Sequence, residues 1–360
     1  MGLLDAPRDP TVAGHFRGAP PPLGSPERKV VVAGRLDAVR AILERRQLAA
    51  ALLAARRNFA WLTAGGSNHV ATSSETGAAP ILVTRDWAAV IAPVNEADRL
   101  RDEELGGTGL AMEVVPWDPA APARRAAELA VDGPIADDAA LEADVLPVRA
   151  VLRPFEVERM AWLATITGSS VEAALRDAVG ATELELAADV SQRVTLAGAR
   201  TPVLLAAADE RIFRYRHPLP SSAAVRSRVM LVLAAERWGL HVAMTRFREL
   251  QPPDGDLDRR WGAVRGVLDA MLAASRPPAT LGEVLAIAEQ AYERAGFGEE
   301  PRLHHQGGVI GYQTRERIAT TGDSFALQPG MAVAWNPSVA GVKLEATAVL
   351  EPNGDLRLLT

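Results

Sequence analysis

The chain contains no cysteine, has no excess of positive charge and has no long apolar run. Without cysteine, disulfides, zinc–thiolate sites, iron–sulfur clusters and thiol nucleophiles are excluded, so any nucleophile must be oxygen, nitrogen or water. A formal net charge of −6 gives no basic footprint for nucleic acid or an anionic membrane. Residues 1–16 carry acids and prolines where a signal peptide needs a basic and then an apolar stretch. We therefore expect a cytoplasmic protein whose partner is a small-molecule substrate.

The length of 360 residues and the hydrophobic fraction of 48% are enough for two domains, each with its own core. Clustered proline and glycine at residues 1–27 predict an N-terminal arm without regular structure. Residues 28–150 predict a small α/β domain, with a helix at 35–55 and strands at 79–84 and 88–93.

The remaining residues, 151–360, contain the same order of elements twice. In each copy two helices come before a pair of strands, and the second helix opens with a capping box, at Thr182 and Glu185 and again at Thr280 and Glu283. The expected elements are helices at 153–179, 182 onward, 256–274 and 280–296, and strands at 227–235, 240–247, 330–337 and 342–350. Two such halves would leave a cleft where they meet.

Five short motifs follow one another along the chain: NFAWLTAG (58–65), RHPLP (216–220), GLHVAMTRF (239–247), HHQGGVIGYQTRE (304–316) and GMAVAWNPSVAGVKLEATAVL (330–350). As an ordered set, together with the duplication, they resemble the pita-bread family of creatinases, prolidases and Xaa-Pro aminopeptidases. The resemblance covers most of the chain. It implies an α+β protein with a C-terminal pita-bread domain, built from duplicated helix-helix-strand-hairpin units, behind a smaller α/β creatinase-like N-terminal domain.

Metallopeptidases of this family hold two divalent ions with two aspartates, one histidine and two glutamates. At the matching positions this chain has apolar residues at 232–234 and at Ala243, then Gly308 and Asn336, and it keeps only Glu345. A lone carboxylate cannot offset the cost of removing water from a hard divalent cation. We therefore predict no metal ligands, no dinuclear metal centre and no cofactor.

The remaining polar residues resemble the metal-free site of creatinase. His217 matches its acid/base histidine, and imidazole can both take a proton from water and deliver one to a leaving nitrogen. His304 and Glu316 would complete the catalytic set. Adjacent histidines point to opposite faces of an extended strand, so we expect His304 to face the cleft and His305 only to support it.

Substrate binding is assigned to residues around these. Arg315 can clamp a carboxylate with two parallel hydrogen bonds. The other candidates are Tyr312, Asn336, Glu345 and His69. Each has a structural alternative: His217 can be a hydrogen-bonded residue beside a proline, and Arg315 and Glu316 can form a surface pair of little energetic value.

These residues predict a metal-independent hydrolase that cleaves a C–N bond in a small, carboxylate-bearing substrate. A lyase would use the same groups. The alternatives are a catalytically silent binding or regulatory protein of the same fold, or a divergent Xaa-Pro peptidase. The resemblance further implies a homodimer in which residues 1–150 of one chain, with the loop at His69, approach the cleft of the other.

Overall fold

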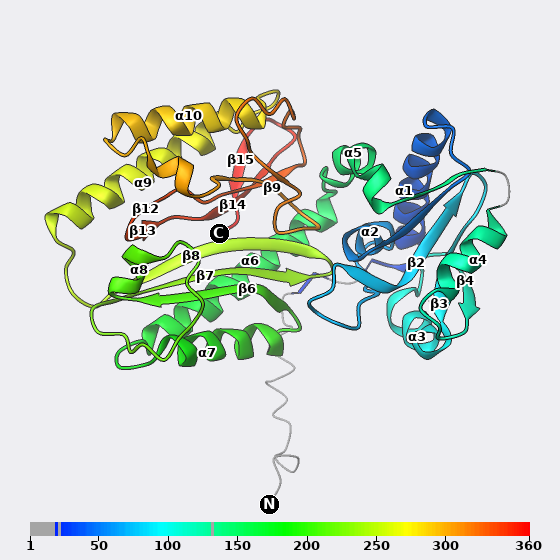
Figure 1. The fold of residues 1–360 in the computed structure, drawn as a ribbon, viewed down its shortest axis with the longest axis horizontal. Coiled ribbons are helices and arrows are strands. Elements are labelled where there is room, and N and C mark those ends of the chain that lie inside the picture. Colours follow the sequence, from blue (N-terminus) through cyan, green and yellow to red (C-terminus); the bar gives the residue numbers. More distant parts are fainter. Residues whose placement is uncertain (1–18, 21–22, 131–132) are drawn as a thin grey trace, which may run out of the picture.

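The computed structural model describes residues 19–20, 23–130 and 133–360, and it shows two α/β lobes joined by one chain crossing (Figure 1). Most of the predicted arm at residues 1–27 lies outside the described residues, and its last three residues already belong to helix α1 (Ser25–Arg45). Among the described helices, none is both long and apolar enough to cross a membrane.

The N-terminal lobe is built on a five-stranded sheet with the strand order β4-β3-β2-β1-β5. Its strands are β1 (Ala50–Ala55), β2 (Thr76–Thr84), β3 (Ala88–Pro93), β4 (Ala111–Val115) and β5 (Ile135–Asp137). Its other helices are α2 (Arg56–Leu62), α3 (Val94–Arg99), the π-turn η2 (Leu100–Glu104), α4 (Ala121–Leu129) and α5 (Asp138–Arg149).

The predicted helix at 35–55 is wrong in its second half. The helix ends at Arg45, and Gln47 takes a left-handed conformation with φ 54°. The alanine- and leucine-rich segment that follows is strand β1, which pairs with β2 on one side and β5 on the other. A buried central strand is apolar on both faces, so its sequence cannot be told from a buried helix by periodicity alone.

The first half of the C-terminal lobe packs helices α6 (Pro154–Arg176) and α7 (Glu183–Leu196) against the sheet β6-β7-β8 (Figure 1). The strands are β6 (Arg200–Ala208), β7 (Arg228–Arg237) and β8 (Leu240–Glu249), with the short helix α8 (Glu210–Arg214) after β6. The capping box is confirmed: Thr182 is the N-cap of α7 and bonds reciprocally with Glu185.

The second half repeats this plan with α9 (Gly255–Ala274), α10 (Leu281–Arg294) and the sheet β10-β9-β11-β14-β15. Its remaining elements are the 3-10 turn η3 (Glu300–Leu303), β9 (Gly307–Ile310), β10 (Arg317–Ile318), β11 (Ala332–Trp335), β12 (Ser338–Val339), β13 (Val342–Lys343), β14 (Ala346–Leu350) and β15 (Leu356–Leu358). The predicted α+β fold with a duplicated C-terminal domain is confirmed. The two halves meet where β8 is bonded to β14 through Thr347.

Candidate functional site

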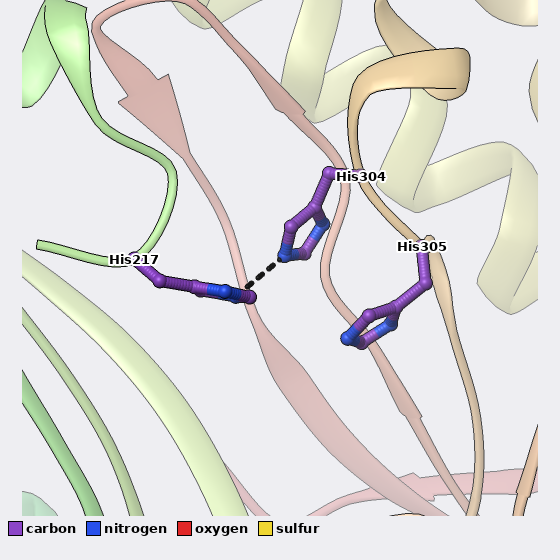
Figure 2. Close-up of side chains that lie close together, drawn as sticks. All are labelled: His217, His304 and His305. Carbon is purple, nitrogen blue, oxygen red and sulfur yellow. Dashed lines mark hydrogen bonds between the residues drawn. The ribbon is translucent and has the colours of Figure 1, made fainter.

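Three histidines from two separate segments form one group, which we call the histidine cluster (Figure 2). His217 lies in the loop between α8 and β7, while His304 and His305 lie between η3 and β9. The Nε2 atoms of His217 and His304 are hydrogen-bonded at 2.9 Å. One nitrogen of each ring lies within 4.8 Å of one nitrogen of each other ring. An atom placed between two of these rings can therefore be within hydrogen-bonding distance of both.

The adjacent histidines do not point to opposite faces, contrary to the expectation for an extended strand, and which of them faces the cleft stays a prediction. The rings of His304 and His305 are stacked, with centroids 4.5 Å apart and planes 22° apart. Both residues precede β9 and lie outside any regular strand, so the alternation of strand side chains does not apply to them. His305 also lies near His217, at 6.5 Å between ring centroids.

Burial favours the neutral form of all three imidazoles. The pKa of His304 is lowered to about 2 and that of His305 to about 4, first by burial and then by neighbouring positive charges. The pKa of His217, the exposed member, is lowered as well, by burial and by the charge of Lys343. At neutral pH the cluster therefore offers free nitrogen lone pairs.

The charges beside the cluster are dominated by cations. Arg315 donates from Nη2 to Oε1 of Glu345 at 2.8 Å, and Thr245 donates to the other oxygen at 3.0 Å. Burial tends to raise the pKa of Glu345, but the charges of Lys343 and Arg315 outweigh it and the pKa is lowered. Lys343 is only 5% exposed. Sequence reasoning missed it, although it stands only two residues before Glu345.

The family's two-metal centre does not fit these residues. Residues 232–234 and Ala243 are buried and apolar. The hydroxyl of Thr347 accepts from the backbone N–H of Ala243 and donates to its carbonyl oxygen. A β-carbon at Gly308 would collide with the carbonyl oxygen of Arg317, so no ligand histidine can stand there. Glu345 is the single acidic ligand position that remains. Within the described ranges, the histidine cluster is the one group of three side chains spaced to hold an ion.

Several buried polar atoms around the cluster have no partner in the chain. Seven such side-chain atoms occur in the described part of the protein, and four of them belong to candidate site residues. These four are Nδ1 of His304, Nδ1 of His305, Nε of Arg315 and Oδ1 of Asn336. Buried polar groups are normally satisfied, so these four need a partner from outside the chain, such as water or a ligand.

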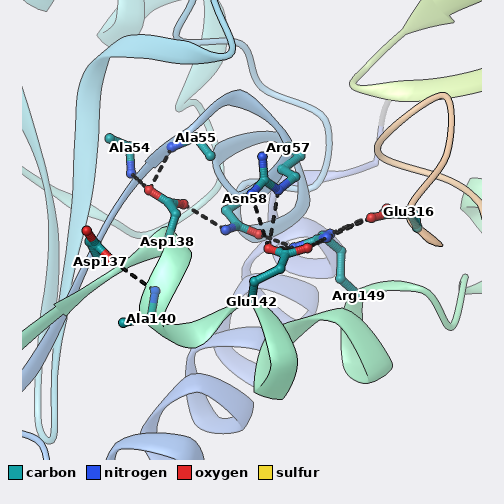
Figure 3. A network of polar contacts seen from close by, with 10 residues as sticks. All are labelled: Ala54, Ala55, Arg57, Asn58, Asp137, Asp138, Ala140, Glu142, Arg149 and Glu316. Carbon is teal, nitrogen blue, oxygen red and sulfur yellow. Dashed lines mark hydrogen bonds and ion pairs between the residues drawn. The ribbon is translucent and has the colours of Figure 1, made fainter. Parts of the chain in front are cut away.

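Glu316 and Tyr312 are both held by hydrogen bonds within the chain, and Tyr312 also lines the cavity between the lobes. Both oxygens of Glu316 accept from Arg149, at 2.7–3.4 Å (Figure 3). Oε1 also accepts from the backbone N–H of Tyr312 at 2.8 Å. The hydroxyl of Tyr312 is hydrogen-bonded to Glu156. These hydrogen bonds let Glu316 fix the glycine loop (residues 307–311) next to Arg315, and its catalytic role stays a prediction.

His69 reaches the C-terminal lobe of its own chain. Its Nε2 lies 2.9 Å from Nη1 of Arg200, and its Nδ1 is hydrogen-bonded to Ser67. Burial and the charges of Arg200 and Arg56 lower the pKa of His69 to about 4. The structure thus places His69 beside Arg200 rather than in the histidine cluster.

A cavity of about 1010 Å³ lies between the two lobes and is lined by both. Its lining from the C-terminal lobe includes His305 and Arg315, and its lining from the N-terminal lobe includes Arg56 and Arg57. The unpartnered atoms of His305 and Arg315 therefore belong to residues that line a space large enough for a small ligand.

The family model described as metallopeptidase family M24 matches residues 158–352, which is more than half of the chain. The chain belongs to this family. The creatinase/prolidase N-terminal domain matches residues 35–154. No curated protein matches the sequence.

Solved structures of low sequence identity share the fold across nearly the whole chain. Dipeptidase PepE from Mycobacterium ulcerans is 19% identical with a TM-score of 0.75, over 92% of this chain and 96% of that one. The prolidase from Pyrococcus horikoshii OT3 is 18% identical with a TM-score of 0.74, over 91% and 98%. The N-terminal domain of the FACT complex subunit SPT16 from chickpea is 12% identical with a TM-score of 0.67, over 91% and 96%.

Proposed function

We propose that this M24 family member hydrolyses a C–N bond in a small, carboxylate-bearing substrate without the family's two-metal centre. The observation that carries the proposal is the group of four unpartnered buried atoms on His304, His305, Arg315 and Asn336. Two of these residues belong to the cluster of neutral imidazoles, and two, His305 and Arg315, line a cavity of about 1010 Å³. Unpaired polar groups in this number suit a ligand better than a packed interior.

In this proposal Arg315 binds the substrate carboxylate through Nε, which has no acceptor in the chain. His217 takes a proton from water, and the resulting hydroxide attacks the carbon of the C–N bond. His217 then returns the proton to the nitrogen as the bond breaks. His304 holds the ring of His217 through their hydrogen bond, and its low pKa keeps it from competing for the proton.

The similar solved structures favour a peptide-like C–N bond, since two of them are named as a dipeptidase and a prolidase. A dipeptide carries the free carboxylate that Arg315 would bind. A divergent Xaa-Pro peptidase that works without metal is therefore one form of the proposal.

The first prediction separates catalysis from binding. His217→Ala should lower kcat by about 10²–10⁴-fold and leave KM within a few fold, because a proton is transferred only in the reaction step. Leu219→Ala is the matched control, since this side chain lies in the same loop and is 72% exposed. Dipeptides with C-terminal proline and small guanidino and amidino acids form the substrate panel. Wild-type turnover by a folded His217→Ala protein would make the histidine structural.

Arg315→Ala should behave differently from His217→Ala. A charge-assisted bond to the carboxylate exists in the bound substrate as well as in the transition state, so its loss should raise KM. Arg302→Ala is the control, since Arg302 pairs with Glu299 on the surface. An unchanged KM for every carboxylate substrate would remove Arg315 from the binding site.

A silent binding protein is the second candidate. The apolar and glycine residues at the metal positions favour it, and the similarity to the N-terminal domain of a FACT complex subunit shows this fold in a protein named for a complex. If this candidate is right, a ligand binds to the protein but is not converted, and removing proton transfer with His217→Ala leaves the affinity for that ligand unchanged.

A further inference from the structure

The cavity between the lobes carries more positive than negative charge. Four arginines line it, namely Arg56, Arg57, Arg200 and Arg315, and the acidic residues that line it are Glu75 and Glu236. Arg57 has Glu142 as its ion-pair partner outside the cavity, and Arg315 has Glu345. Arg56 and Arg200 both form their ion pair with Glu236, while Glu75 meets Arg56 through its backbone carbonyl.

Glu236 lies at the end of β7. Arg200 forms an ion pair with its Oε2, and Arg56 lies 3.7 Å from the same oxygen. Glu236 is 5% exposed, so its carboxylate is largely removed from bulk water, whereas the two arginines are partly exposed. Burial and the charge of Arg200 lower the pKa of Arg56, with Glu236 opposing them. Two guanidinium groups on one carboxylate leave an excess of positive charge at this contact, which an anion in the cavity would balance.

The two arginines are also held in place. Arg56 donates from Nη1 to the carbonyl oxygens of Thr72 and Ser74, at 2.9 and 3.0 Å, which fixes it to the loop before β2. Arg200 is fixed by His69 as well as by Glu236. Because these guanidinium groups are positioned before any ligand arrives, binding an anion would cost little side-chain entropy.

The same cavity has a second place for an anion. Arg315 lines it and has an unpartnered buried donor, Nε. The two places belong to different parts of the fold: Arg315 follows the glycine loop, whereas Arg200 begins β6 and Arg56 begins α2.

We propose that the cavity selects a substrate with two anionic groups, one bound by Arg315 and the other by Arg56 and Arg200. The proposal rests on the proposed function for the role of the first group. The substrate class is then a dicarboxylate, for example a dipeptide with an acidic side chain. The second anion would balance the surplus charge around Glu236, which a monocarboxylate at Arg315 leaves in place.

The test is binding of simple dicarboxylates, measured by calorimetry on the full chain. The probes are the straight-chain series from succinate to suberate, and the controls are the monocarboxylates from butyrate to octanoate. At the best length, the dicarboxylate should bind at least about tenfold more tightly than the matching monocarboxylate, since it gains a charge-assisted contact. Arg200→Met and Arg56→Met should each remove this advantage and leave monocarboxylate binding unchanged.

Glu236→Gln gives a result of opposite sign. It removes the carboxylate that competes for the two arginines, so dicarboxylates should bind more tightly than to the wild type. Arg45→Met is the neutral control, because Arg45 pairs with Asp144 and does not line the cavity. The proposal is overturned if no dicarboxylate exceeds its matched monocarboxylate, or if both arginine variants fold and keep the advantage. Because binding needs no turnover, a chain that binds dicarboxylates but hydrolyses nothing would refute the proposed function alone.

Discussion

His304 and His305 make the histidine cluster sensitive to acid. Their folded-state pKa values, about 2 and about 4, lie below the usual value of 6.5. Below pH 6.5 the unfolded chain binds more protons than the folded one. The stability that the neutral histidines contribute is therefore fully present above pH 6.5 and is lost as the pH falls below it. Lowering the pH from about 7 to about 5 should reduce the free energy of unfolding by roughly 1–2 kcal/mol per histidine. Urea titrations at the two pH values measure this.

The control for this prediction is His304→Asn, which keeps a polar side chain but cannot be protonated. Between the two pH values this variant should lose less free energy of unfolding than the wild type, and the difference should equal the contribution of one histidine, roughly 1–2 kcal/mol. An equal loss in both proteins would mean that His304 does not carry the acid sensitivity.

Helix α5 is tied to the glycine loop by a single buried arginine. Arg149 is fully buried and contacts Glu316, Glu142 and Asn58 at 2.6–3.4 Å (Figure 3). Removing one partner of a buried pair leaves an uncompensated charge, so Arg149→Met should cost about 3–5 kcal/mol of unfolding free energy. Arg45→Met, at an exposed ion pair to Asp144, should cost under about 1 kcal/mol.

Chemical denaturation of both variants checks this prediction. The double variant Arg149→Met with Glu316→Gln should recover part of the loss, because it also removes the carboxylate that would be left unpaired. If Arg149→Met is no less stable than Arg45→Met, the network around α5 does not stabilise the fold.

Elements with local signals were predictable and those fixed by distant contacts were not. The capping boxes at Thr182 and Thr280 set two helix starts correctly, because each bonds to a residue three positions away. Arg149 and Glu316 are 167 residues apart, and no periodicity indicates that pair. His305 was underrated for a related reason: its direction depends on the bend between η3 and β9, not on strand alternation.

The metal content of the whole chain tests the absence of a two-metal centre. We predict that purified protein holds no stoichiometric manganese, cobalt or zinc, because the family's ligand positions keep one acidic residue. The charges of Lys343 and Arg315 beside Glu345 further disfavour a cation there. Elemental analysis of the wild type and of His304→Ala is the measurement.

The number of metal ions per chain distinguishes a metal-free site from a single-metal site and from a two-metal centre. About one ion per chain that is lost in His304→Ala would place a single metal at the histidine cluster and contradict metal-independent catalysis. About two ions per chain, lost with activity on chelation, would mean that a two-metal centre exists after all.

At the largest scale we predict a homodimer, since two-fold assembly is the commonest for soluble oligomers and the family resemblance implies it. In such a dimer the loop at His69 would approach the partner's cleft. Val70, the next residue, is 66% exposed in the single chain, so a charge there should disturb only an interface. Val70→Asp should shift light scattering at micromolar concentration toward the monomer, while Val179→Asp, at a site 75% exposed, should not. A wild-type chain that is monomeric and still turns over substrate would show that one chain holds the complete site.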